Sequence, residues 1–422
     1  MLRALPPNSM ALVMAAPESR RNGDVDYLYR QNSDFYYLTG FPEPEAVALL
    51  MPGRPEGEYV LFNRERNLEA EIWNGIRAGQ EGACSEYGAN QAFNINTLDA
   101  KLPTFLTQYE RIYYPIGQNR QFDQRVFGWI NQLRAKVRAG VGAPSEVIDV
   151  SRLLHEMRLV KTPAEVAVMR KAAEISAQAH VHSMQTCVAG MREYEIAAQL
   201  LYDFYRQGCE APAYSPIVGS GPNACVLHYV SNNRQIQDGD LVLIDAAGEY
   251  QNYAADITRT FPANGRFTAE QRAIYEVVLA AQMAVIAQIK PGVLWDSLQQ
   301  TAVQVLTEGM VDVGLLQGRV DSLIAQQTYR QFYMHNVGHW LGMDVHDVGA
   351  YRLKNAWRPL EVGMAFTVEP GIYIRPSPEV DRKWWHIGVR IEDDVVVTGS
   401  GCDVLSKDVP KQVSEIEALM RK

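Results

Sequence analysis

The chain alternates long segments of helical periodicity with short apolar runs of strand length, and one such series repeats within its second half. A pair of helices and a group of strands come first after Thr162, and a second pair of helices and a second group of strands follow. The predicted elements are helices at about 163–185 and 191–207, strands between 214 and 261, helices at about 268–290 and 294–308, and strands between 335 and 397. Two halves with the same element order predict an α+β domain with pseudo-two-fold symmetry.

Local residues mark where some of these helices begin and end. Thr162 can cap a helix that has Pro163 at its first position, and Glu165 completes a capping box. A similar Thr/Gln pair opens the third helix, and Gly309 predicts the end of the fourth. The strong helix start at Thr162 also indicates that a new domain begins close to it.

Residues 1–157 predict a smaller, mixed α/β domain, which leaves 158–422 for the larger one. Strands are predicted within 46–53 and 58–63, and a helix within 117–138. The opening apolar run, "MALVMAAP", is too short for a signal peptide and is preceded by two prolines, so we interpret it as a first strand.

Composition narrows the class of protein. The 422 residues are 47% hydrophobic and 21% charged, as in soluble globular proteins. The formal net charge is −9 without a basic cluster, so we expect no nucleic-acid partner. The apolar runs are too short to span a membrane, and five scattered cysteines without a C-x-x-C pair favour a reducing compartment. We therefore expect a cytoplasmic protein with no membrane partner.

Two aspartates interrupt the strand-like segment "LVLIDAAGEYQNYAADITRTF", residues 241–261. Asp245 closes one apolar run and Asp256 opens the next. A turn near 249–252 pairs them directly, whereas a turn centred on 251–252 makes them diagonal neighbours on one face. In both registers their Cβ atoms lie about 5–8 Å apart. The pair is therefore either a solvated hairpin edge or a site that holds positive charge between two carboxylates.

Three further segments carry side chains that can bind metals. "FYMHNVGHWLGMDVHDVG" contains His335, His339 and His346, "FTVEPGIY" ends an apolar run at Glu369, and "GVRIEDDVVV" places Glu392 inside another. A single histidine or strand glutamate is more often a hydrogen-bonded core residue or a solvated edge residue than a metal ligand. With the two aspartates, however, the four carboxylates and one imidazole form a hard, oxygen-rich donor set. Such a set suits Mn²⁺, Co²⁺, Fe²⁺ or Zn²⁺ in a carboxylate-bridged pair.

Other catalytic motifs fail in their context. "GSGPNA" at 219–224 loosely fits a dinucleotide-binding loop, but the "CVLHYV" that follows predicts a strand where that motif needs a helix. The chain has no G-x-S-x-G, and His155-Glu156 lacks the second histidine of H-E-x-x-H. A dinucleotide site, an esterase elbow and an H-E-x-x-H zinc site are therefore not expected.

The metal-binding pattern resembles that of a known family. In order, spacing and flanking residues, five positions resemble the metal ligands of the pita-bread metallopeptidases: Asp245, Asp256, His339, Glu369 and Glu392. The large N-terminal domain, with "RQNSDFYYLTGFPEPEAVALL" and "AEIWNGIRAGQEGA", is similar to that of the proline-directed branch, the Xaa-Pro aminopeptidases (aminopeptidase P). The resemblance covers nearly the whole chain and implies a C-terminal pita-bread domain of α+β class.

This resemblance implies a metalloaminopeptidase that releases the first residue from peptides with proline in second position. Its cofactors would be two divalent metal ions, Mn²⁺ foremost, with Co²⁺, Zn²⁺ or Fe²⁺ as alternatives. Asp256 and Glu392 would bridge the ions, and Asp245 would complete one ion's shell. His339 and Glu369 would complete the other. A hydroxide between the ions would attack the scissile carbonyl, and Glu369 would carry the proton to the departing proline nitrogen.

The same resemblance implies roles for residues around the metals. His228 and His346 would hydrogen-bond the substrate and the developing oxyanion, with His335 lining the pocket nearby. Arg390 shares the predicted strand face of Glu392 and would brace a ligand carboxylate.

Three aromatic residues and the N-terminal domain are assigned to substrate access and assembly. Trp340 and Tyr373 would line an apolar proline pocket, and Trp73 would reach the site of a neighbouring subunit. The family's N-terminal domain implies a homo-oligomer, a dimer or a tetramer, in which this domain also limits access to the active site.

Two other functions stay open at this stage. A prolidase, which cleaves Xaa-Pro dipeptides, shares the metals and the fold. A pita-bread protein that binds peptides or partners without catalysis is the other alternative, although retention of all five ligands argues against it.

Overall fold

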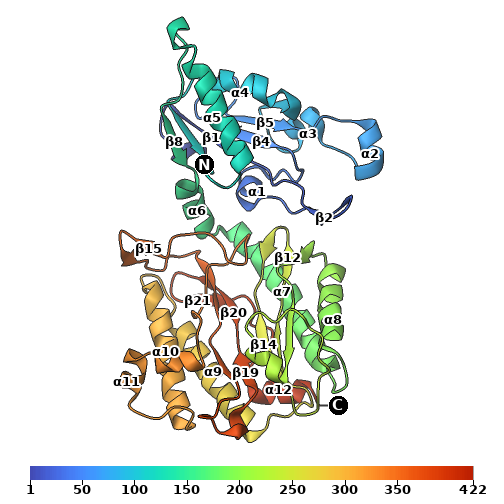
Figure 1. The fold of residues 1–422 in the computed structure, drawn as a ribbon, viewed down its shortest axis with the longest axis vertical. Coiled ribbons are helices and arrows are strands. Elements are labelled where there is room, and N and C mark those ends of the chain that lie inside the picture. Colours follow the sequence, from blue (N-terminus) through green and yellow to red (C-terminus); the bar gives the residue numbers. More distant parts are fainter. Residues whose placement is uncertain (422) are drawn as a thin grey trace. The chain divides into compact units, whose positions relative to one another are not determined.

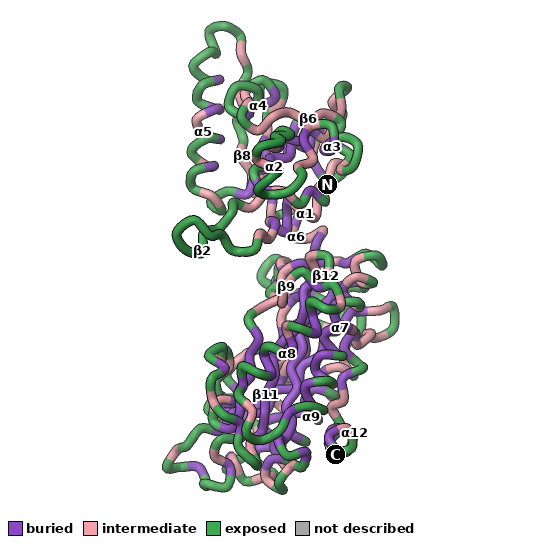
Figure 2. Tube along the Cα trace, turned by 90° about the vertical axis from the view of Figure 1, so that its right-hand side faces the viewer, coloured by how far each residue is buried: buried purple, intermediate pink, exposed green. Residues whose placement is uncertain are grey.

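The computed structural model describes residues 1–421, which form two compact units. The first is Met1–Met157, and the second begins at Arg158. Each has its own buried apolar core, and in Figure 2 the buried segments run through the interior of each unit. Among the described residues, no helix combines the length and the apolar character needed to cross a bilayer.

Unit 1 is built on a mixed six-stranded sheet, which confirms the predicted α/β character of this segment. The strand order is β6-β5-β4-β1-β7-β8, with antiparallel pairing of β1, β4 and β5 and parallel pairing toward both edges. The strands are β1 (Ser9–Met14), β4 (Val47–Leu50), β5 (Tyr59–Asn63), β6 (Gln91–Asn94), β7 (Arg111–Tyr114) and β8 (Glu146–Asp149), with a separate hairpin of β2 (Arg20–Asn22) and β3 (Val25–Asp26). The helices are α1 (Ser33–Thr39), α2 (Leu68–Asn74), α3 (Gly79–Ser85), α4 (Leu98–Leu106), α5 (Arg120–Arg134) and α6 (Ser151–Leu159).

Unit 2 has the predicted repeat of two helices followed by strands. In Figure 1 its central strands, among them β14, β19 and β20, lie between α7 and α8 on one side and α9 and α10 on the other. The first half contains α7 (Pro163–Thr186), α8 (Glu193–Arg206), β9 (Ala211–Pro212), β10 (Ile217–Ser220), β11 (Leu241–Asp245), β12 (Gly248–Tyr250), β13 (Tyr253–Ala254) and β14 (Thr258–Pro262). The second contains α9 (Ala269–Gln288), α10 (Trp295–Asp312), α11 (Val320–Ala325), β15 (Arg352–Leu353), β16 (Ala356–Trp357), β17 (Ala365–Val368), β18 (Gly371–Ile374), β19 (Ile387–Arg390), β20 (Asp393–Val397), β21 (Cys402–Val404) and α12 (Val413–Leu419).

The helix starts follow the predicted caps, but one predicted helix end is wrong. Thr162 forms a complete capping box with Glu165 at the start of α7, and Thr268 does so at the start of α9. The helix α10 does not end before Gly309 but continues to Asp312. A Cβ at Gly309 would collide with the side chain of Val277 on α9. This glycine therefore allows two helices to pack closely, and it is not a terminator.

The segment after "GSGPNA" is also not the predicted strand. Gly221–Cys225 forms a short 3-10 helix, and residues 226–230 continue as turn and loop. No α-helix follows β10 directly, so the dinucleotide motif still lacks the element it requires. The loop conformation leaves His228 free of strand pairing, next to the site described below.

The hairpin that carries the two aspartates adopts the second of the two predicted registers. Gln251 and Asn252 both have left-handed backbone conformations and form the turn, with Glu249 paired to Ala254. The same offset continues into β11 and β14, where Asp245 lies opposite Thr258. Asp256 is therefore a diagonal neighbour of Asp245, not its direct partner.

Two buried ion clusters connect segments of unit 2 that are distant in sequence. Asp393 is fully buried and accepts hydrogen bonds from Arg259 at 2.7 Å and Lys411 at 2.6 Å. Burial alone raises the pKa of Asp393, but these two cations outweigh burial and lower it to about 2. The second cluster joins the carboxylate of Asp347 to Arg158 at 2.5 Å and to Lys161 at 2.9 Å. Both clusters tie strands or loops to residues distant in sequence.

Gly338 is expected to be essential for the packing of the segment that contains the site histidines. A Cβ at this position would overlap the backbone carbonyl of Thr367, which cannot move without breaking β17. We expect Gly338→Ala to lower the free energy of unfolding by about 1–3 kcal/mol, the usual cost of overpacking. Urea denaturation followed by circular dichroism measures this change. Gly399→Ala is the control, because no atom lies within 4 Å of its added Cβ; equal stability of both variants would contradict the expectation.

Candidate active site

The four predicted carboxylates lie where strands are interrupted. Asp245 is the last residue of β11, and Asp256 lies between β13 and β14. Glu369 lies between β17 and β18, and Glu392 lies between β19 and β20, not inside one strand as the sequence predicted. At these breaks the chain changes pairing partner: β19 pairs with β18, whereas β20 pairs with β17. Irregular positions of this kind re-aim side chains, and here they let carboxylates from four segments converge.

His339 reaches the carboxylates from a loop that packs along β17. The backbone N–H of His339 donates to the hydroxyl of Thr367, and the backbone carbonyl of His339 accepts from the backbone N–H of Thr367. The Nε2 atom lies 3.4 Å from Oδ2 of Asp256 and 3.5 Å from Oε1 of Glu369. The other ring nitrogen, Nδ1, lies 3.0 Å from the carbonyl of Trp340, which fixes the ring orientation.

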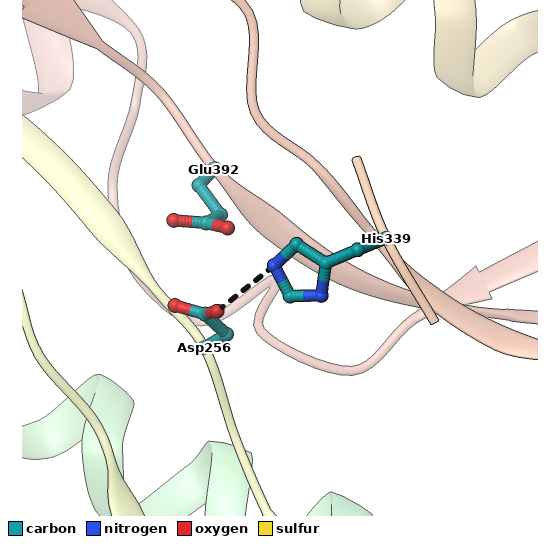
Figure 3. A group of neighbouring side chains, drawn as sticks. All are labelled: Asp256, His339 and Glu392. Atoms are coloured by element: carbon teal, nitrogen blue, oxygen red, sulfur yellow. Dashed lines mark ion pairs between the residues drawn. The ribbon is translucent and has the colours of Figure 1, made fainter. Parts of the chain in front are cut away.

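Three of these groups are arranged as a metal-binding cluster. One ligand atom each from Asp256, His339 and Glu392 lies within 4.8 Å of the other two. Figure 3 shows the imidazole of His339 and the two carboxylates directed toward one another from three separate segments. Glu369 contacts the same imidazole, and Asp245 is linked to Asp256 through a shared hydrogen-bond partner.

Burial makes this concentration of negative charge costly. Burial raises the pKa of Asp245. The positive charge of Arg390 lowers this pKa in part, and the negative charge of Asp256 raises it further. Burial likewise raises the pKa of Glu369 to about 7. Burial and the charges of neighbouring carboxylates raise the pKa of Glu392 well above its ordinary value. The ionised forms of these carboxyl groups are therefore costly here, because the surrounding side chains do not neutralise them fully.

His339 has the opposite balance. Burial lowers its pKa, but the hydrogen bond that the ring donates to Asp256 and the charges of Asp256 and Glu369 outweigh burial and raise the pKa to about 9. An imidazole surrounded by carboxylates in this way binds positive charge, either as a proton or as a metal ion. Metal binding requires the neutral imidazole, with Nε2 as the available ligand atom.

The donor set fits divalent cations. Arg390 contacts the carboxylates through a 2.6 Å bond to Oδ2 of Asp245, and the imidazole of His339 contacts Asp256 and Glu369. One guanidinium and one imidazole cannot balance four carboxylates, whose oxygens converge within a pocket of about 450 Å³. Oxygen-rich, hard donor sets of this kind bind divalent metal ions.

The three histidines predicted to contact the substrate line this same pocket. His228, His335 and His346 all contribute to its wall together with the five predicted ligands and Arg390. The ring of His346 packs edge-on against that of His339, with centroids 4.2 Å apart. Burial lowers the pKa of His335 to about 4 and also lowers that of His346, so both are neutral near pH 7.

Two of the three predicted aromatic residues are buried away from the surface that a peptide could contact. Trp340 is fully buried among Trp295, Tyr351 and Phe366, so its ring presents no surface to a peptide. Tyr373 is 1% exposed, and its hydroxyl accepts a hydrogen bond from Arg390 and contacts the ring of His335, which makes it a support behind the pocket. The expected role of both residues in lining a proline pocket is therefore corrected. Trp73 belongs to unit 1, where it is 85% exposed on α2.

Sequence reasoning missed the residues that hold the ligands in place. The hydroxyl of Tyr214 lies 2.5 Å from Oδ1 of Asp245 and 2.6 Å from Oδ1 of Asp256, although it can donate only one proton. Thr258 donates to Glu392 at 2.6 Å. Strand parity with Asp256 could have identified Thr258. No periodic signal marks Tyr214, because it lies in a loop before β10.

Comparison with known proteins agrees with this arrangement. A model of metallopeptidase family M24 matches residues 167–399, and a model of the aminopeptidase P N-terminal domain matches residues 1–113. The Xaa-Pro aminopeptidase of Escherichia coli is 45% identical over all of this chain and 95% of its own length. Human Xaa-Pro aminopeptidase 3 is 34% identical over 97% of this chain and 80% of its own.

Solved structures show the same fold over both units. The Pseudomonas aeruginosa aminopeptidase PepP is 56% identical and superposes with a TM-score of 0.98, covering 99% of this chain and 95% of that one. A zinc-substituted aminopeptidase P from E. coli, solved with product, superposes with a TM-score of 0.97 at 45% identity and covers 100% of this chain and 96% of that one. The predicted pita-bread domain with a smaller α/β domain is thus confirmed, and the chain belongs to metallopeptidase family M24.

Proposed function

We propose that this protein is a metal-dependent Xaa-Pro aminopeptidase, which releases the first residue of a peptide whose second residue is proline. The observation that carries the proposal is the convergence of four carboxylates and His339 in one pocket that three further histidines line. Membership of family M24 and full-length similarity to proteins named Xaa-Pro aminopeptidase support the choice of substrate.

The proposed metal ligands are Asp245, Asp256, His339, Glu369 and Glu392. Resemblance to the family would assign Asp256 and Glu392 to both ions, and one oxygen of each lies within 4.8 Å of the other and of a ring nitrogen of His339. The oxygen-rich donors favour Mn²⁺ among the divalent ions, with Co²⁺, Zn²⁺ and Fe²⁺ as alternatives. Divalent ions held there would supply Lewis-acid chemistry, which acidifies water and polarises a carbonyl.

The chain's own groups would position the substrate and move its protons. We assign His228 and His346 to hydrogen bonds with the substrate carbonyl oxygen, since both rings line the pocket. Glu369 would accept a proton and return it to the proline nitrogen. Its carboxylate lines the same pocket as the other proposed ligands, so it lies among the groups that would surround the reacting bond. Arg390 and Tyr214 would hold Asp245 in its ligating orientation.

We propose further that the protein is a homo-oligomer and that unit 1 mediates its assembly and limits access to the site. The supporting feature is an exposed apolar strip on and beside α2, in which Leu68, Ile72, Trp73 and Ile76 are 75–85% exposed. Apolar strips of this kind usually mark contact surfaces. A second copy of the chain would cover the strip, and Trp73 of the first copy would then lie near the active site of the second. Five free cysteines support a cytoplasmic location.

Peptide length is the first test of the proposed activity. We expect hydrolysis of an Ala-Pro-Ala tripeptide, measured by release of free alanine, to be faster than hydrolysis of the dipeptide Ala-Pro. The reason is that an aminopeptidase pocket must leave room for the chain beyond the proline. An Ala-Ala-Ala tripeptide serves as the control for the proline requirement. Cleavage of the dipeptide alone would instead identify a prolidase.

Metal content and activity should change together when the ligand cluster is altered. We expect a chelator to abolish tripeptide cleavage, and Mn²⁺ to restore it, with about two ions bound per chain by elemental analysis. Asp256→Ala should lower kcat/KM by more than about 100-fold and reduce bound metal. Loss of a residue that only hydrogen-bonds to a metal ligand already lowers activity or metal affinity by about 10–100-fold, and loss of a ligand itself should cost more. Asp403→Asn is the matched control, since this partly exposed aspartate pairs with Arg170 away from the pocket. Full activity of Asp256→Ala would refute the ligand assignment and favour a non-catalytic binding protein.

The apolar strip gives a test of assembly. We expect the wild-type protein to sediment as an oligomer and the double variant Ile72→Glu/Trp73→Glu to sediment at lower mass, because two buried charges would destabilise the contact. Analytical ultracentrifugation measures the change. Tyr205→Glu provides the control, because Tyr205 is also exposed but lies on α8. An unchanged mass of the double variant, or a monomeric wild type, would contradict the proposal.

A further inference from the structure

A second cavity adjoins the metal-site pocket. Its volume is about 520 Å³, within the range of pockets that bind small organic groups. It shares part of its wall with the metal-site pocket, namely Asn336, Gly338, His339 and Tyr351. Because these four residues contribute to both walls, the two cavities adjoin each other at this position.

Three aromatic side chains, Trp295, Tyr351 and Trp357, form one part of the cavity wall, which is mainly apolar and in this differs from the metal-site pocket. The polar side chains of Asp296, Gln299 and Gln300 complete the lining. Trp295 and Tyr351 are fixed: their ring centroids lie 4.9 Å apart, and the hydroxyl of Tyr351 accepts a hydrogen bond from the backbone of Trp340. An aromatic wall that is held in place before binding loses little entropy when it accepts an apolar group.

Trp357 forms the more accessible side of the wall. It ends the short hairpin of β15 and β16, and it is partly exposed. The guanidinium of Arg352 lies over its ring at 4.2 Å and supports it from the hairpin. Because Trp357 is not part of the buried core, its side chain can be truncated with a smaller loss of stability than that of Trp295.

The position of the cavity selects one part of the substrate. The side chain of the first residue is attached to the carbon next to the scissile carbonyl, so it starts beside the metal ligands. The second residue is proline, whose ring closes on its own backbone. The third residue begins about 7 Å farther along the chain. A cavity that shares His339 with the metal site is therefore reached most directly by the first side chain.

We propose that this cavity binds the side chain of the substrate's first residue, and that it selects large apolar or aromatic side chains through Trp295, Tyr351 and Trp357. The inference rests on the proposed aminopeptidase function and specifies its substrate class. Trp357 is then a specificity-determining residue, whose contact contributes more to cleavage of Phe-Pro-Ala than of Ala-Pro-Ala.

The test is a ratio of kcat/KM values for Phe-Pro-Ala and Ala-Pro-Ala. We expect the wild-type ratio to favour phenylalanine by about tenfold or more, as apolar pockets usually do, and Trp357→Ala to lower this ratio about tenfold. Trp357→Phe should retain most of the ratio, because it keeps an aromatic wall. Trp385→Ala is the matched control: it removes a partly buried tryptophan of unit 2 that lines neither cavity. Circular dichroism shows that each variant is folded.

Each other outcome has a distinct meaning. A ratio in Trp357→Ala that stays within about twofold of the wild-type value would overturn the inference while leaving the proposed function intact. A selective loss of Ala-Pro-Phe cleavage would place the third residue in the cavity and would also overturn the inference. Failure of the wild-type protein to cleave any of the three peptides would overturn both the inference and the proposed function.

Discussion

Repulsion among closely packed, buried carboxylates is the constraint around which unit 2 is organised. Three consecutive acidic residues show how the fold manages it. Glu392 joins the metal-binding cluster, and Asp393 is neutralised on the other face of the strand by Arg259 and Lys411. Asp394 accepts the backbone N–H of Asp256. A run of like charges that would destabilise an ordinary strand is thus divided among three separate environments.

The repeated architecture explains why the cluster can form at all. Each half of unit 2 contributes two carboxylates from breaks between paired strands, and the helix pairs on both sides hold those strands together (Figure 1). The two halves also meet through direct bonds: Thr258 of the first donates to Glu392 of the second. Neither half has the full donor set, because His339 comes only from the second and Asp256 only from the first. The site is therefore a product of packing the two halves, not of either one.

The sequence predicted the features that depend on local chemistry. Caps at Thr162 and Thr268 marked real helix starts, and alternation limited the hairpin to two registers, of which one is present. It did not reveal what depends on packing between distant segments. A glycine at 309 reads as a terminator unless the neighbouring helix is known, and the buried environment of Trp340 depends on residues from other elements. The convergence of the metal-binding cluster was expected through resemblance, since spacing along the chain does not place strands side by side.

The ion cluster of Asp347 with Arg158 and Lys161 limits where a fragment of the catalytic unit can begin. The segment shared with family M24 spans 167–399, yet Arg158 and Lys161 lie before it. Lys411, which neutralises Asp393, lies after it. A fragment cut at the limits of the shared segment would leave two buried carboxylates without these counter-charges, one beside His346 and one beside Glu392. A fragment that keeps the counter-charges of both buried carboxylates must therefore extend at least from Arg158 to Lys411, beyond the segment that sequence similarity defines.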